Sequence, residues 1–289
     1  MVEKNKKVIV QKFGGTSVGS PERIMAIADR TADLIPSVEH LVIVVSAMGK
    51  TTDELVQLAS SITDSPCPRE YDALVSTGEN ISASLLAMSL KSKGIDAISL
   101  TGPQAGIFTE QLHAKAKILD IKTKRIKEEL SKNKVVVITG FQGVNPRLDV
   151  TTIGRGGSDT SAVALAAALG CEECEIYTDV DGVYTTDPRR EEKASKLQEI
   201  SYEEMLEMAS LGAKVLHPRA VECAKENNII LHVRSSFNRN EGTRVKEASG
   251  LEVQKPVTGV TVNDKEAEIS IIGIPDKPGI AGEIFTTLA

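Results

Sequence analysis

The chain has 289 residues, of which 41% are hydrophobic, 26% charged and 3% aromatic, and its net charge is −6. This length suits one large α/β domain or two smaller ones. The acidic balance argues against a general nucleic-acid-binding protein, because such domains carry clustered Lys and Arg. The sequence has neither an apolar run of about 18 residues nor the apolar core of a secretory signal, so we expect a soluble, cytoplasmic protein without nucleic-acid or membrane partners.

Cysteine usage agrees with a reducing compartment. The four cysteines, Cys67, Cys171, Cys174 and Cys223, are too few and too scattered for a disulfide framework. Cys171 and Cys174 form one CxxC pair, but a zinc site would need further ligands at matching spacing. We therefore interpret this pair as packing residues and expect no metal site built from protein side chains.

The first element is a strand followed by a glycine loop and a helix. A β-branched run at residues 8–10 leads through Lys12 to Gly14 and Gly15, and Ser20 and Pro21 are typical of a helix start. Glycines let backbone amides approach a bulky anion, and a helix amino-terminus and a lysine add positive charge. The segment predicts a phosphate site, although a tight turn without a ligand is the structural alternative.

The next segments place two further polar groups between apolar elements. A helix over 21–35 is followed by a buried strand over 41–45, and Ser46 comes directly after it. Thr52 can either cap the following helix or touch a ligand. A helical pair over 69–93 is interrupted at 76–79, where Glu79 is either a buried carboxylate that binds a cation or an exposed residue of a first helical turn.

Strands and helices alternate along most of the remaining chain. We expect a three-layer αβα sandwich with a mainly parallel central sheet, which binds ligands at the carboxyl ends of its strands. The further predicted strands cover residues 97–100, 117–120, 135–139, 175–178 and 229–234, and the further predicted helices cover 123–131, 160–169 and 201–211.

A second glycine cluster opens the helix over 160–169. Gly154, Arg155 and Gly156 precede Ser158 and Asp159, which combines a helix start with an arginine fork suited to a carboxylate. Either glycine cluster alone could be a turn, but two in one domain favour an anion-binding function.

An aspartate-rich turn and a basic segment follow. The turn over 178–189 resembles a calcium loop superficially but lacks the closing glutamate of that motif. A frame for a nucleotide is the better interpretation, with Tyr184 as a flat apolar surface and Arg189 as a phosphate contact. Lys214 stands at a helix junction where a cation near a phosphate is plausible, whereas His217 before Pro218 is more typical of a packed or capping histidine than of a catalytic one.

The pattern changes near residue 250. Residues 235–248 are expected to form a polar boundary, and two strand-like runs cover 257–264 and 268–274, before a Pro- and Gly-containing loop. One strand pair and a helix start cannot bury a core. We therefore expect a first domain over 1–247 and, over 248–289, a linker and the start of a smaller α+β domain inside which the chain ends.

Taken together, these segments resemble the aspartate kinases of the amino acid kinase family. The matching blocks, in family order, are KFGGTS (12–17), VVSAMG (44–49), STGE (76–79), TIGRGGSDTSA (152–162), YTDVDGVYTTDPR (177–189) and GAKVLHPRA (212–220). PDKPGIAG at 275–282 is similar to the ligand loop of an ACT regulatory domain. The resemblance implies ATP-dependent phosphorylation of the side-chain carboxylate of L-aspartate, which opens lysine, threonine and methionine synthesis. It also implies feedback by lysine or threonine at the ACT region, and a homo-oligomer or pairing with a regulatory subunit.

The resemblance also implies roles for individual residues. Catalysis is assigned to Lys12, Asp159 and Lys214. Nucleotide binding is assigned to Lys12, Phe13, Gly14, Gly15, Thr178, Asp179, Tyr184, Asp187, Arg189, Lys214 and Val215. Aspartate binding is assigned to Ser46, Thr52, Glu79, Arg155 and Ser158. Mg²⁺ is expected to be held mainly by the nucleotide.

Elementary chemistry fits this assignment. The substrate carboxylate is ionised at neutral pH and needs no general base, so the barrier is electrostatic and the task is to bring two anions together.

Two alternative functions stay open: a kinase of the same fold acting on glutamate, acetylglutamate or a nucleoside monophosphate, and a non-catalytic amino-acid sensor. An ADP-release assay across these acceptors separates the enzymes, and nucleotide binding separates both from the sensor.

Overall fold

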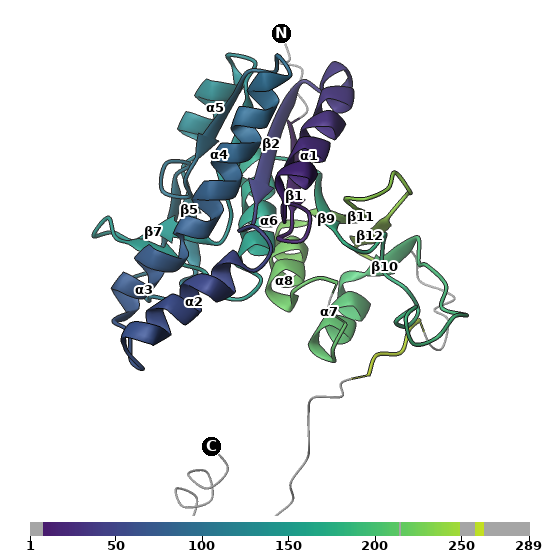
Figure 1. The fold of residues 1–289 in the computed structure, drawn as a ribbon. Coiled ribbons are helices and arrows are strands. Elements are labelled where there is room, and N and C mark those ends of the chain that lie inside the picture. Colours follow the sequence, from purple (N-terminus) through teal and green to yellow (C-terminus); the bar gives the residue numbers. More distant parts are fainter. Residues whose placement is uncertain (1–7, 214, 249–257, 263–289) are drawn as a thin grey trace, which may run out of the picture.

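An eight-stranded sheet forms the centre of the computed structural model, which describes residues 8–213, 215–248 and 258–262 (Figure 1). The strand order is β10-β12-β11-β9-β1-β2-β6-β3, with the six strands from β11 to β3 parallel to one another and β12 antiparallel to β11. The strands are β1 (Val8–Phe13), β2 (His40–Val45), β3 (Ala97–Leu100), β6 (Val135–Thr139), β9 (Glu173–Thr178), β10 (Glu199–Ser201), β11 (Ile230–Ser235) and β12 (Thr243–Lys246).

Helices cover both faces of this sheet. Helices α1 (Pro21–Leu34) and α4 (Thr77–Ser92) pack together on one face, where Figure 1 shows them side by side. The other face carries α5 (Lys124–Leu130), α6 (Gly157–Leu169), α7 (Tyr202–Ser210) and α8 (Pro218–Asn227). The predicted three-layer αβα sandwich with a mainly parallel sheet is confirmed.

The two apolar layers follow from side-chain alternation in the central strands. In β2, Val42 and Val44 point into the layer beneath α6, whereas Ile43 and Val45 point toward α1 and α4. Every residue of β6 is buried, as expected for a parallel strand covered on both faces. Because β1 obeys the same alternation, Lys12 lies on the same face as Val10, toward α6.

Local capping signals place the starts of α1 and α7 correctly. Ser20 is the N-cap of α1 and accepts from the Arg23 backbone N–H, with Pro21 at the first helical position. Ser201 and Glu204 form a full capping box at α7. Thr52 is not an N-cap, because α2 (Thr51–Ile62) already begins one residue earlier. Helices α3 (Pro68–Val75) and α4 meet at the interruption predicted for residues 76–79.

The sequence did not reveal a second, four-stranded sheet. Its order is β5-β4-β7-β8, with β4 (Ile107–Thr109), β5 (Ile118–Ile121), β7 (Gln142–Val144) and β8 (Val150–Thr152). Three of these strands have only three residues, too few for an alternation pattern to be read. The sheet matters because β8 leads directly into the second glycine cluster.

The polar stretch 235–248 is not simply a boundary, because β12 lies within it and extends the main sheet. Of the strands expected at 257–264 and 268–274, only residues 258–262 are described, and they form no strand. The Val260 backbone N–H donates to the Thr185 carbonyl at 2.7 Å, and the Thr261 hydroxyl donates to the Leu211 carbonyl at 3.1 Å. The remaining predictions for that region, including the ACT-like loop, lie outside the described residues. Among the residues described, no helix has the length and apolar character to cross a membrane.

Candidate active site

The first glycine loop closes over the carboxyl end of β1. The Gly14 N–H donates to the Tyr177 carbonyl at 3.2 Å, and the Gly14 carbonyl accepts from two amides of the following turn. A Cβ on Gly14 would lie 3.4 Å from Lys12 Nζ, and a Cβ on Gly15 would lie 3.0 Å from the Ala47 carbonyl oxygen. The loop therefore brings main chain close to the lysine, as an anion site requires. Phe13 is fully buried and stacks on Tyr177 with ring centroids 4.6 Å apart, so its side chain belongs to the core.

Lys12 forms an ion pair with Asp159 in the first turn of α6. Lys12 Nζ lies 2.5 Å from Asp159 Oδ1, and their side chains are 10% and 14% exposed. Two predicted site residues that are far apart in the sequence are thus in direct contact. Breaking such a shielded pair is costly, so the carboxylate holds the ammonium in place beside the glycine loop.

The second glycine cluster follows β8 and begins α6. Gly154 and Gly156 have φ values of 83° and 70°, a conformation that favours glycine, and a Cβ on Gly156 would lie 2.2 Å from the His217 ring. Arg155 between them is exposed, and within the described residues it has no hydrogen bond or ion pair. His217 caps α8 by accepting from the Arg219 N–H at 3.3 Å, which confirms the capping interpretation.

Ser158 and Glu79 line the same edge of the sheet from two sides. A Cβ on Gly140, directly after β6, would lie 2.8 Å from Ser158 Oγ. Glu79 Oε1 accepts from the Ala47 N–H at 3.1 Å in the loop after β2, next to Ser46. Of the residues predicted to bind aspartate, Ser46 follows β2 and Arg155 follows β8. Ser158, Glu79 and Thr52 lie in the first turns of α6, α4 and α2, and Thr52 is half-buried.

Glu79 is buried rather than exposed, which decides between the two sequence alternatives. It is 3% exposed, and its second oxygen, Oε2, has no hydrogen-bond partner in the described part of the chain. Burial raises the pKa of Glu79 to about 7, and the Ala47 N–H only partly offsets this. A buried carboxylate oxygen without a donor is expensive, so the site is suited to a cationic ligand.

Two of the predicted nucleotide residues, Thr178 and Asp179, lie at the carboxyl end of β9, beside the end of β11. Thr178 is the last residue of β9, and its carbonyl accepts from both the N–H and the hydroxyl of Ser236. Ser236 Oγ also lies 2.6 Å from Ser17 Oγ, which belongs to the first glycine loop. Asp179 is exposed directly after β9. This hydroxyl contact connects the first glycine loop with the strand ends assigned to the nucleotide.

The outer part of that turn is held by internal contacts. Tyr184 donates its hydroxyl to Asp181 at 2.7 Å, and Arg189 pairs with Asp187 through Nε and a terminal nitrogen at 3.0 and 2.9 Å. Arg189 lowers the pKa of Asp187 to about 2. The structure therefore does not bring Tyr184 or Arg189 into contact with Lys12. Lys214 lies outside the described residues, and its neighbour Val215 packs against the core.

The remaining candidate for a metal centre lies elsewhere. Glu173, Glu175 and His232 are the group of three potential ligands that the described residues place within reach of one ion. They lie nearer the amino ends of β9 and β11, and Glu173 and Glu175 are paired with Arg244 and Arg234. The CxxC pair contributes to packing, because Cys174 is fully buried in β9 and burial raises the pKa of Cys171 to about 11.

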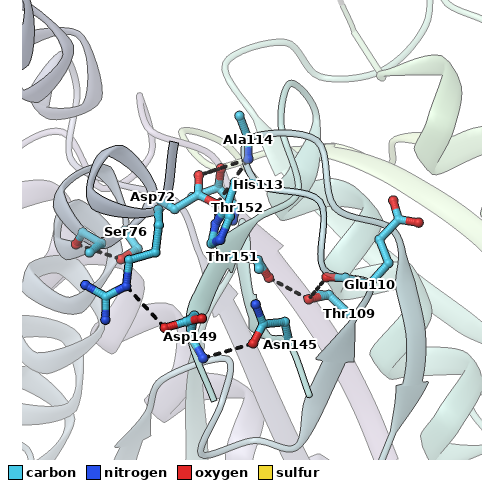
Figure 2. A network of polar contacts seen from close by, with 12 residues as sticks. Asp72, Ser76, Thr109, Glu110, His113, Ala114, Asn145, Asp149, Thr151 and Thr152 are labelled. Carbon is cyan, nitrogen blue, oxygen red and sulfur yellow. Dashed lines mark hydrogen bonds and ion pairs between the residues drawn. The ribbon is translucent and has the colours of Figure 1, made fainter. Parts of the chain in front are cut away.

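Sequence reasoning missed two polar residues beside this site. Asp72 in α3 is fully buried and binds the end of β8 (Figure 2). Arg219 in α8 donates to the Ile153 carbonyl at 2.5 Å, just before the second glycine cluster. An aspartate among the apolar residues of a helix was the available signal for Asp72, and for Arg219 the signal was its place in the GAKVLHPRA block (212–220).

Comparison with known proteins defines the family. The profile of the amino acid kinase family matches residues 7–235. Aspartokinase of Bacillus sp. (strain MGA3) is 55% identical over 282 residues, which cover 98% of this chain and 69% of that protein.

Two crystal structures are also similar. Aspartate kinase from Synechocystis superposes with a TM-score of 0.75 at 51% identity, covering 85% of this chain and 40% of that one. Aspartokinase III of E. coli, in complex with aspartate and ADP, superposes with a TM-score of 0.77 at 28% identity, covering 84% of this chain and 65% of that one. With a family profile over most of the chain, curated relatives of this similarity and the paired Lys12 and Asp159 beneath a glycine loop, the chain belongs to the aspartate kinases, phosphotransferases of the amino acid kinase family.

Proposed function

We propose that the carboxyl edge of the central sheet transfers the γ-phosphoryl group of ATP to the side-chain carboxylate of L-aspartate, with nucleotide and amino acid held on opposite sides of Lys12. A carboxylate oxygen of aspartate forms the new bond to phosphorus, the bond from that phosphorus to the β-phosphate oxygen breaks, and ADP leaves. No proton has to be removed from the nucleophile. The chain must therefore supply positive charge and alignment.

The observation that carries the aspartate assignment is the buried, half-satisfied carboxylate of Glu79. Its oxygen without a donor can accept from an ammonium group, and the α-ammonium of an amino acid is such a group. Arg155, exposed and without a partner among the described residues, can pair with a substrate carboxylate through its fork. Ser46, next to the Ala47 N–H that binds Glu79, and Ser158, three residues after Arg155, are proposed to add hydrogen bonds. A substrate with one ammonium and two carboxylates matches this set of charges.

On the nucleotide side, Lys12 and the amides of the first glycine loop are proposed to bind the β- and γ-phosphates. Asp159 holds the Lys12 ammonium through their 2.5 Å contact. Thr178 and Asp179 are proposed to border the nucleotide, together with the turn that carries Tyr184, Asp187 and Arg189. Lys214 and Val215 are assigned to it by family resemblance. The E. coli relative that was crystallised with aspartate and ADP supports this division of the site.

Magnesium is proposed to arrive on the nucleotide. Asp159 is already paired with Lys12, and Asp179 is exposed at the same edge, so the donor set fits an ion held by phosphates and at most one or two carboxylates. When bound, such an ion neutralises phosphate charge. The residues described here then hold the phosphates and the attacking carboxylate in line.

We also propose a regulatory region, an oligomeric assembly and a cellular location for this chain. We infer that residues 248–289 begin a regulatory region for lysine or threonine, because an E. coli aspartokinase III structure contains lysine and aspartate. A homo-oligomer or a pairing with a regulatory subunit is inferred from the family alone. Four free cysteines and the use of ATP support a cytoplasmic location.

Hydroxamate formation tests the proposal. With ATP and hydroxylamine, the acyl phosphate yields a hydroxamate, which we expect with aspartate and not with glutamate or acetylglutamate. Arg155→Ala should raise the KM for aspartate at least tenfold and change the KM for ATP less than twofold. Arg147→Ala, which removes an exposed arginine from the β7–β8 turn, is the matched control. Equal aspartate KM values for the two variants would refute the assignment of Arg155.

A further inference from the structure

Asp72 is a fully buried carboxylate whose two oxygens bind three different residues (Figure 2). Oδ1 accepts from the Thr152 hydroxyl at 2.6 Å, and Oδ2 accepts from the Thr152 N–H at 3.0 Å. The Ala114 N–H donates to both oxygens, at 3.1 and 3.0 Å. His113 Nδ1 lies 2.7 Å from Oδ2. These partners satisfy a group that would otherwise be costly to bury, and they hold α3, the 110–116 segment and β8 together.

Two partners of Asp72 lead directly to the second glycine cluster. Thr152 is the last residue of β8, and the neighbouring Ile153 is held by its N–H on the Phe141 carbonyl at 2.8 Å. Ala114 has a positive φ of 63°, and its carbonyl would meet a Cβ on Gly154 at 2.9 Å. The Ala114 N–H thus contacts Asp72, and the Ala114 carbonyl lies close to Gly154, the residue before Arg155.

The other end of α3 leads to Glu79. The Asp72 carbonyl accepts from the Ser76 N–H at 3.1 Å at the junction of α3 and α4. The Ser76 carbonyl accepts from Gln142 Nε2 at 2.7 Å, and Glu79 follows in the first turn of α4. Asp72 thus contacts the backbone that leads to Glu79 through its carbonyl, and the backbone that leads to Arg155 through its carboxylate.

We propose that Asp72 is a positioning residue for aspartate binding, which fixes the distance between the ammonium acceptor Glu79 and the carboxylate partner Arg155. This inference rests on the proposed function. Asp72 is separated from substrate by its own partners, so it acts through Thr152 and Ala114. The phosphate-binding elements, Lys12 and the first glycine loop, lie on other segments and have no hydrogen bond to Asp72, His113, Ala114 or Thr152 among the described residues.

The test is Asp72→Asn, which keeps the volume but replaces one acceptor oxygen with an amide group that faces N–H donors. We expect a KM for aspartate at least tenfold above wild type, with the KM for ATP within twofold. Thr152→Val removes only the 2.6 Å hydroxyl contact and should raise the aspartate KM by a smaller factor, about threefold. It also serves if Asp72→Asn does not fold. Asp149→Asn is the matched control, because Asp149 lies in the same network but pairs with Arg69 near the surface (Figure 2).

Four outcomes are distinguishable. An aspartate KM within twofold of wild type in both Asp72→Asn and Thr152→Val overturns the inference. Equal rises in the KM values for aspartate and ATP also overturn it, since they indicate a general structural role. If Arg155→Ala leaves the aspartate KM unchanged, the assignment of Arg155 to aspartate binding in the proposed function is refuted. If Arg155→Ala raises the aspartate KM while Asp72→Asn does not, only the positioning role of Asp72 is refuted.

Discussion

Replacing Glu79 by Gln should stabilise the fold at alkaline pH while weakening aspartate binding. Burial raises the pKa of Glu79 from 4.5 to about 7 in the folded chain. Between these pH values the unfolded chain has released the proton that the folded chain still binds, so the free energy of unfolding falls as pH rises. A pKa difference of this size corresponds to about 3 kcal/mol.

The glutamine side chain cannot ionise and retains an oxygen for the Ala47 N–H, so this loss should be absent in Glu79→Gln. The difference in unfolding free energy between Glu79→Gln and wild type should therefore grow by about 3 kcal/mol in favour of the variant between about pH 4 and pH 8. Urea titrations at several pH values measure it. Glu70→Gln, on the exposed face of α3, is the control and should follow the wild type. Parallel pH profiles for Glu79→Gln and wild type would refute the argument.

The same residue predicts a pH dependence of substrate binding. Only ionised Glu79 attracts the substrate ammonium, and with a pKa of about 7 its ionised fraction rises about tenfold between pH 6 and pH 8. The KM for aspartate should fall by a similar factor over this range in wild type. In Glu79→Gln it should be high and nearly independent of pH.

Three further changes probe Lys12, the second glycine cluster and the buried interior of β9. Lys12→Ala should lower kcat by orders of magnitude while circular dichroism shows a retained fold, and unchanged turnover would remove Lys12 from the mechanism. Gly156→Ala adds a Cβ that would lie 2.2 Å from the His217 ring, at a residue with a positive φ. The melting temperature of this variant should therefore be several degrees lower than that of wild type, and an unchanged value would contradict the close packing. Cys174→Ser places a hydroxyl in the buried interior of β9, so urea titration should show a free energy of unfolding about 1–3 kcal/mol lower, with activity retained. Loss of activity without loss of stability would argue for a functional thiol.

The parts of the fold that could be predicted were those with strong local signals. The apolar runs that became β2 and β6 and the capping box at Ser201 were each recognisable within a few residues. β4, β7 and β8 were not, because three residues carry no periodicity and their stability comes from pairing across the chain. β12 was hidden for a similar reason, since its polar residues alternate with only two buried ones.

The site divides in the same way. Lys12, Glu79 and Asp159 stood out because each is a charge beside glycines or within an apolar pattern. Their direct contacts could not be predicted, because the distance between Lys12 and Asp159 depends on how β1 and α6 pack. The roles of individual nucleotide and substrate residues stay predictions. Asp72 shows the limit most clearly, since its partners lie 41 to 80 residues further along the chain.

Glycines at the carboxyl edge of the central sheet pack closely against neighbouring segments, and this limits how the enzyme can be redesigned. Gly15 abuts the Ala47 carbonyl, a Cβ on Gly78 would lie 2.8 Å from the Ala47 Cβ, and one on Gly140 would lie 2.7 Å from the Ser158 Cβ. Surfaces without side chains have no rotamers to exchange, so their shape is inherited from the sheet and cannot be resculpted by point substitution. Libraries that seek a new acceptor should therefore leave these glycines untouched and vary the polar residues proposed to bind aspartate, Ser46, Arg155 and Ser158.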